Sequence, residues 1–195
     1  GIIMKTSNVI VIAAIMALVC SSAAFADKYT SKVQKMVVSG TSTLHDWSAP
    51  ASNLTAKGEI TIQNTSLQAI SSLNVVCVAK SIKSEKESMD EKIYDALKAE
   101  DFPNITYTLS RVNSLTKSGD DWVVETTGIL TIGGTAKTVD MTVKAKIQAD
   151  GEIVFTGSKK ITLTSFNLER PSAMLGVIKC GDDITLTFSL TMKKS

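Results

Sequence analysis

The sequence predicts an all-β fold, an antiparallel barrel of eight strands with one short α-helix. Apolar and polar residues alternate strictly in several separate segments, which is typical of strands with one wet and one apolar face. Turn residues lie between successive segments, which favours antiparallel neighbours. A single window has helical spacing instead. The elements follow in order below.

Residues 1–26 are expected to be a secretory signal peptide that is cleaved after Ala26. Lys5 supplies the positive start, residues 9–19 are apolar, and Ala24-Phe25-Ala26 has the small residues of a cleavage site. This apolar run is shorter than the roughly 20 residues that span a bilayer. A lipidated Cys20 is the less favoured alternative, because Val19 is too large for the position before such a cysteine. The sequence therefore predicts a periplasmic or secreted domain over residues 27–195, with no transmembrane segment.

Composition narrows the range of partners. The chain has 21 Lys and Arg against 19 Asp and Glu, scattered along its length, so no basic patch points to nucleic acid or to an anionic membrane surface. After cleavage two cysteines remain, Cys77 and Cys180, and both a disulfide and two separate buried thiols stay open. With one histidine, His45, they do not make the usual closed zinc site.

Strand alternation is clearest in Leu54–Gln63, Thr138–Ile147 and Asp183–Met192. A helix would need a period of 3.6 residues, which none of the three shows. Less regular strands are expected in five more segments, which brings the total to about eight: Lys32–Ser42, Leu73–Ile82, Ile105–Arg111, Trp122–Ile132 and Ile153–Leu163.

The helical window covers residues 88–99. Its apolar residues recur every four positions and share one face: Met89, Ile93 and Leu97. Ser88 with Glu91 predicts a capping box at the helix start. Pro103 forces Phe102 out of helical geometry, so the chain is expected to re-enter the sheet at Asn104 or Ile105.

Turn signals separate the later strands, at residues 117–120, 132–135, 149–151 and 180–182. Such short connections predict an antiparallel meander. A sandwich and a barrel both fit this pattern, but only closure removes the exposed edges of the sheet. An eight-stranded barrel is just wide enough to be filled by side chains or to hold one ligand.

Four segments together resemble the YceI-like family of secreted lipid-binding proteins, over essentially the whole of residues 27–195. They are Ser39–Trp47, Leu97–Tyr107, Gly128–Val139 and Gly181–Leu186, in that order. The resemblance implies a lipocalin-like barrel with a helix alongside and an elongated apolar tunnel for an isoprenoid lipid, without cofactor or metal. The chain departs from commoner members in a longer stretch over residues 165–181 and in the element His45-Asp46-Trp47.

The apolar faces of the strands supply the candidate tunnel lining: Ile60, Ile62, Ile105, Tyr107, Leu109, Val139, Met141, Val143, Ile184, Leu186 and Phe188. Periodicity does not separate a tunnel from a packed core, because both need inward-facing apolar residues. The chain has few large aromatic residues to fill a barrel. Composition therefore favours a container.

His45 and Asp46 are adjacent in the sequence and are its only neighbouring pair of imidazole and carboxylate side chains. Neighbouring strand residues point to opposite faces, so no catalytic residue is predicted. Candidates for a barrel mouth or for a lipid head-group site are His45, Trp47, Phe166 and Arg170, and two further cations near a mouth are Lys137 and Arg111. Residues 165–178 are expected to plug one end of the barrel, with a lid over the tunnel as the alternative.

These observations predict a non-catalytic carrier of an isoprenoid lipid, either a polyprenyl phosphate or a quinone. The alternative is a fully packed structural or interaction barrel with no small-molecule ligand. An apolar chain needs no hydrogen bonds to be held, because each buried methylene contributes about 0.8 kcal/mol. The identity of the lipid and the oligomeric state stay open at this point.

Overall fold

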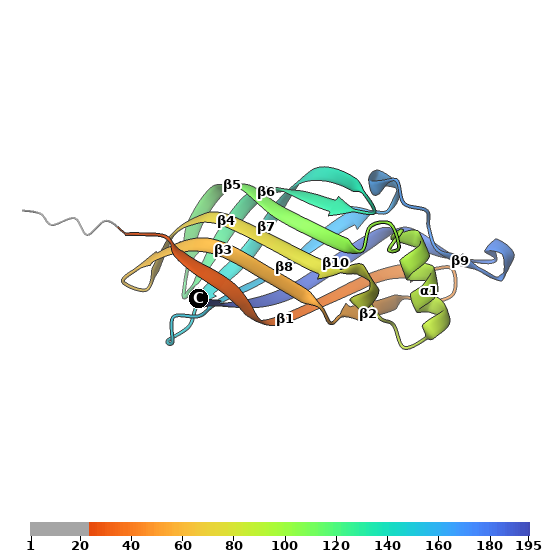
Figure 1. Cartoon of the computed structure of the whole chain (residues 1–195), viewed down its shortest axis with the longest axis horizontal. Coiled ribbons are helices and arrows are strands. Elements are labelled where there is room, and N and C mark those ends of the chain that lie inside the picture. Colours follow the sequence, from red (N-terminus) through yellow and green to blue (C-terminus); the bar gives the residue numbers. More distant parts are fainter. Residues whose placement is uncertain (1–23) are drawn as a thin grey trace, which may run out of the picture.

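The eight longest strands of the chain close into an antiparallel barrel (Figure 1). The computed structural model describes residues 24–195. Closure comes from β1, which pairs with β3 at one edge and with β10 at the other. The barrel strands, in order around the wall, are β1 (Asp27–Ser42), β3 (Leu54–Gln63), β4 (Ser66–Val78), β5 (Asn104–Ser118), β6 (Asp121–Ile132), β7 (Thr135–Ile147), β8 (Ile153–Thr162) and β10 (Ile178–Lys194). The predicted fold class is confirmed.

Two short strands and part of β4 were not predicted. β2 (Trp47–Ala51) forms a hairpin with β1, and β9 (Ser172–Ala173) pairs with the start of β10. β4 begins at Ser66 and not at Leu73, because its pairing with β3 shifts register twice. Such bulges break the period of two, and so they hide the first half of the strand from a pattern search.

The single α-helix, α1, spans Glu87–Ala96. The predicted capping box is wrong, because the N-cap is Lys86 and no side chain caps the helix. Asp90 instead binds the segment before the helix: its carboxylate accepts hydrogen bonds from the backbone N–H of Ser84 at 2.6 Å and from the Ser84 hydroxyl at 2.7 Å. The carboxylate therefore fixes the approach to the helix. After Pro103 the chain re-enters the sheet at Asn104, as predicted.

One end of the barrel is solid. Its core contains Tyr29, Ile60, Phe155 and Leu190, together with Ile153 and Met192, which have no exposed surface. These residues come from β1, β3, β8 and β10 and pack into one buried cluster. The solid end supplies the apolar burial that stabilises the closed sheet.

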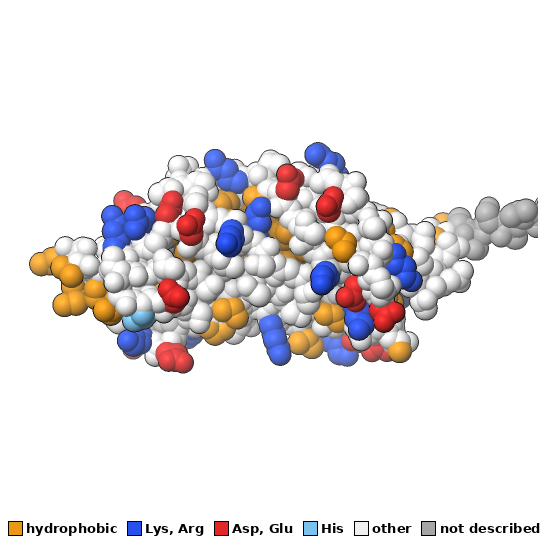
Figure 2. Space-filling view, turned by 180° about the vertical axis from the view of Figure 1, so that it is seen from behind, with side chains coloured by type: hydrophobic (Ala, Val, Ile, Leu, Met, Phe, Trp, Pro, Cys, Tyr) orange, Lys and Arg blue, Asp and Glu red, His pale blue; other side chains and the backbone are white. Residues whose placement is uncertain are grey.

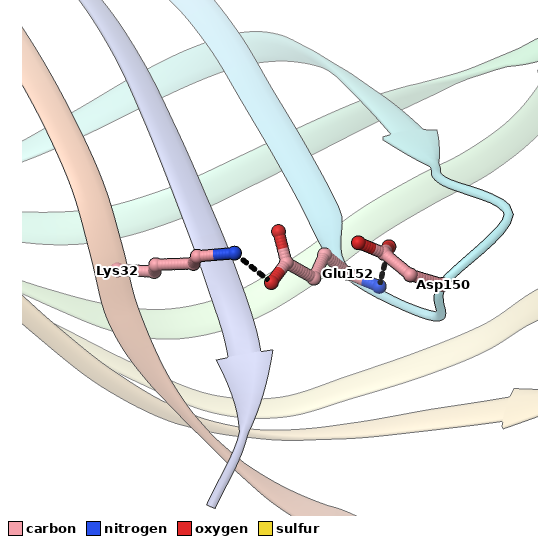
Figure 3. Close-up of polar contacts among 3 residues, drawn as sticks. All are labelled: Lys32, Asp150 and Glu152. Carbon is pink, nitrogen blue, oxygen red and sulfur yellow. Dashed lines mark hydrogen bonds and ion pairs between the residues drawn. The ribbon is translucent and has the colours of Figure 1, made fainter.

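An ion pair crosses the closing strands at this solid end. A bulge between Ser31 and Val33 of β1 turns Lys32 outward, and Figure 3 shows Lys32 extending across β10 to Glu152. The Lys32 Nζ to Glu152 Oε1 distance is 2.6 Å, and the backbone N–H of Glu152 donates to Asp150 at 2.9 Å. The pair therefore links the first strand to the turn that precedes β8.

The opposite end is covered by α1 and by the chain after β8. Leu168 is buried and approaches Gly133 of the β6–β7 turn. Residues 163–171 therefore close this end, whereas the tip at residues 174–177 extends into solvent. Figure 2 shows hydrophobic side chains gathered at that end of the molecule, and the exposed ones around the tip are Met174, Leu175 and Val177.

Ile60→Ala tests the solid end. Ile60 is fully buried, so the substitution should lower the free energy of unfolding by about 2–5 kcal/mol through lost burial and a residual cavity. Lys57→Ala is the matched control on the same strand, because Lys57 is exposed, and it should change stability by about 0.5 kcal/mol or less. Urea denaturation followed by circular dichroism measures both. Equal effects of the two substitutions would contradict this assignment of the core.

Candidate functional site

Between the solid end and α1 the barrel is hollow. The cavity has a volume of about 180 Å³. All eight barrel strands contribute to its wall, and α1 and residues 163–171 close it at one end. The wall is almost entirely apolar, so the cavity suits a hydrocarbon better than water.

A hollow barrel and a packed one differ in how much surface their inward-facing side chains leave accessible. Met141, Val143, Leu186 and Phe188 line the cavity, and each keeps part of its surface accessible. Ile153, which points inward at the solid end, has none. The first four residues therefore border unfilled space, and Ile153 does not. The alternative of a fully packed barrel therefore does not describe this structure.

Most of the predicted tunnel residues lie in the wall of this cavity: Ile105, Tyr107, Leu109, Met141, Val143, Ile184, Leu186 and Phe188. Three do not. Ile60 belongs to the solid end, Ile62 packs against it, and Val139 packs against the buried cluster around Leu163, Phe166 and Leu168. Alternation identifies the inward face of a strand but carries no information about where along the barrel the interior is filled.

Several lining residues were not predicted. Leu73 and Val75 come from the bulged strand β4, Ile93 comes from α1, and Leu97 directly follows α1 at the end that the helix covers. Phe155 and Ile161 lie on β8, whose residues alternate between inward and outward positions over 153–161. The helix residues carried a helical pattern, but nothing in that pattern says which cavity the helix covers.

The four predicted mouth residues are dispersed. Trp47 lines the cavity, and its indole N–H donates to the Thr41 carbonyl at 3.2 Å. Phe166 is buried in the cluster of the closing segment with Leu163 and Leu168, outside the cavity wall. His45 lies in the exposed turn between β1 and β2, and its Nδ1 is 2.7 Å from the backbone oxygen of Asp46, so imidazole and carboxylate do not pair.

The fourth mouth residue, Arg170, lies near the end of the segment that closes the barrel. Its Nε–H donates to the carbonyl of Cys180 at 2.8 Å, and the side chain is not part of the cavity wall. Arg111 likewise donates to Asn113 at 2.9 Å on the exposed surface. Arg111 therefore makes its hydrogen bond on the exposed surface, and Arg170 links the closing segment to β10. Neither arginine is part of the cavity wall.

A small polar group interrupts the apolar wall. The Tyr107 hydroxyl lies 3.2 Å from Thr126 Oγ1, which donates to the carbonyl of Met141 at 3.1 Å. Gly128 makes room for the tyrosine ring, since a Cβ there would approach the ring at 2.4 Å. Burial raises the pKa of the Tyr107 hydroxyl above its usual range. Tyr107 is therefore a neutral hydrogen-bonding group at physiological pH.

Both cysteines of the described chain are free thiols. Cys77 is buried and lines the cavity, and burial raises the pKa of its thiol. Cys180 is partly exposed near Arg170, outside the cavity wall, and burial also raises the pKa of its thiol. The disulfide that the sequence left open is not formed.

No helix within residues 24–195 has the length and apolar character needed to cross a bilayer. The predicted signal peptide lies almost entirely outside the described residues, and so the structure does not address it.

Comparison with solved structures gives the same fold. A polyisoprenoid binding domain from Saccharophagus degradans, implicated in plant cell wall breakdown, has a TM-score of 0.66 at 14% identity, covering 86% of this chain and 98% of its own. BcnA of Burkholderia cenocepacia has a TM-score of 0.61 at 19% identity, covering 81% and 95%. The YceI protein of Campylobacter jejuni has a TM-score of 0.58 at 21% identity, covering 75% and 85%.

These identities are low, so the three likenesses concern the fold. No curated protein matches the sequence. A family model, described as the YceI-like domain, matches residues 26–192, which is nearly the whole of the described barrel. The resemblance first seen in four short segments is thereby confirmed, and the chain belongs to the YceI-like domain family.

Proposed function

We propose that this chain is a non-catalytic carrier that holds an isoprenoid-type lipid inside its barrel. One observation carries the proposal: a closed barrel, solid at one end, encloses an elongated cavity with an almost wholly apolar wall. Each methylene of an isoprenoid that enters it contributes about 0.8 kcal/mol. The related fold of a polyisoprenoid binding domain supports the same class of ligand.

The polar groups of the wall support binding without catalysis. Catalysis by a nucleophile needs an attacking group and a base within hydrogen-bond reach. Tyr107 and Thr126 reach each other and a backbone carbonyl, and His45 lies outside the cavity. The hydrogen bonds of Tyr107 and Thr126 therefore orient these side chains within the wall.

We further propose that the carrier works in the periplasm or outside the cell. The support is the sequence of residues 1–26, with its positive start, its short apolar run and its Ala-x-Ala end. Mass spectrometry of the protein purified from its host tests this directly, because a mature chain should begin at Asp27.

Filling the cavity should abolish lipid binding. Leu186 and Thr187 are neighbours on β10; Leu186 lines the cavity and Thr187 is exposed. Leu186→Trp should therefore reduce uptake of a prenyl lipid at least tenfold, whereas Thr187→Trp, with the same added ring on the outer face, should bind as the parent does. Native mass spectrometry after incubation with ubiquinone and with a polyprenyl phosphate measures the bound fraction. A parent protein that takes up neither lipid would refute the carrier proposal.

A bound lipid should also shield Cys77 from alkylation. The thiolate is the reactive form, and burial raises the pKa of both thiols, so both should react slowly at pH 7 and faster as the pH rises toward and past 9. Saturation with lipid should slow the alkylation of Cys77 by N-ethylmaleimide several-fold. Cys180 lies outside the cavity wall and serves as the internal control. Peptide mapping by mass spectrometry gives both rates, and an unchanged Cys77 rate at full occupancy would place the lipid elsewhere.

A further inference from the structure

The cavity wall contains one charged side chain among the described residues, Lys159. Lys159 occupies an inward position on β8: the residues two and four positions before it are Gly157 and Phe155, and the residue two positions after it is Ile161. Its partner across the ladder with β10 is Leu186, which also lines the cavity. The alternation of the strand therefore directs a cation to the inner face of the barrel.

Lys159 lies at the point where two strands part. Pairing between β7 and β8 runs from Ile147 opposite Ile153 to Val143 opposite Gly157 and goes no further, although both strands continue. The Lys159 ammonium reaches across this seam and donates to the Asp140 carbonyl at 2.6 Å. The side chain is half-buried, with its stem along the apolar wall and its charge at the seam.

The Lys159 ammonium has spare hydrogen-bonding capacity. An ammonium has three N–H donors, and its partner in the described chain is a neutral carbonyl. No carboxylate lies within ion-pair distance of Lys159 among residues 24–195, where the ion pairs are Lys32 with Glu152, Lys80 with Glu100 and Lys194 with Asp27. The ammonium therefore keeps N–H donors for an anion that comes to the seam.

The other polar groups of the wall lie beside the same stretch of β7. Thr126 donates to the carbonyl of Met141, the residue next to Asp140, and the Tyr107 hydroxyl lies 3.2 Å from Thr126. Thr126 and Lys159 therefore donate to the carbonyls of two neighbouring residues of β7, Met141 and Asp140. The polar contacts of Tyr107, Thr126 and Lys159 converge on this stretch of β7.

We propose that Lys159 binds the anionic head group of the lipid, a single phosphate or carboxylate, while the apolar chain fills the cavity. This inference rests on the proposed carrier function and narrows its cargo to an acidic amphiphile. A quinone, which has no charge to pair with the ammonium, is then a poorer ligand. The seam between β7 and β8 is where the head group lies.

Substitution of Lys159 tests the proposal, with its neighbour as control. Lys159→Met keeps the apolar stem and removes the charge; Lys160→Met makes the same change on an exposed position. The probes are geranylgeranyl monophosphate, geranylgeraniol and palmitate, and calorimetric titration of the full-length protein gives each Kd. A charged hydrogen bond corresponds to about tenfold or more in affinity.

The expected result is that Lys159→Met weakens binding of an anionic probe at least tenfold, leaves geranylgeraniol unchanged, and is rescued by Lys159→Arg. Lys160→Met should behave as the parent protein does.

The anionic probe whose binding is weakened, the phosphate or palmitate, identifies the acid that Lys159 binds. Anionic probes that bind no better than geranylgeraniol, or that bind Lys159→Met as they bind the parent, would overturn this inference and leave the carrier function standing. Equal weakening of all three probes would show that Lys159 supports the wall, and would also overturn it. Failure of every probe to bind the parent would refute both proposals.

Discussion

The pairing of β1 with β10 is the contact on which the barrel depends. It joins the first strand of the domain to the last and runs from Tyr29 opposite Lys194 to Ser42 opposite Cys180. Without it the sheet would end in two long unpaired edges, and the inward faces of the other strands would meet water. Contacts so distant in sequence have to form before an enclosed interior exists, so the cavity is a consequence of this closure.

Sequence patterns predicted the barrel well because its strands obey a period of two over most of their length. Departures from that period hid the rest: the bulges in β4, the extra residue at Lys32, and β2, whose five residues are too few to show alternation. The predicted capping box failed because no side chain caps α1, and the Asp90 carboxylate binds Ser84 before the helix, a contact that no local motif records. The alternation of β8 places Lys159 on the inward face of the strand. Its position at the seam depends on where the pairing between β7 and β8 stops, which the sequence pattern does not indicate.

Glycines shape the interior as much as the apolar side chains do. A Cβ at Gly157 would come within 2.7 Å of the Phe188 ring, and a Cβ at Gly128 would come within 2.4 Å of the Tyr107 ring. Each aromatic ring therefore occupies the space that a side chain at the glycine of the neighbouring strand would need. The two glycines thus let the barrel hold aromatic rings against its wall beside the cavity.

The hollow also makes this fold responsive to hydrostatic pressure. Unfolding a protein eliminates its internal voids, so the unfolded chain and its water take up less volume than an empty barrel. A cavity of about 180 Å³ adds to that difference, and pressure favours the smaller state. A hydrocarbon that filled the hollow would remove this void, so the filled barrel would resist pressure better than the unfilled one. The pressure needed to unfold the protein would therefore depend on how much of the cavity is filled.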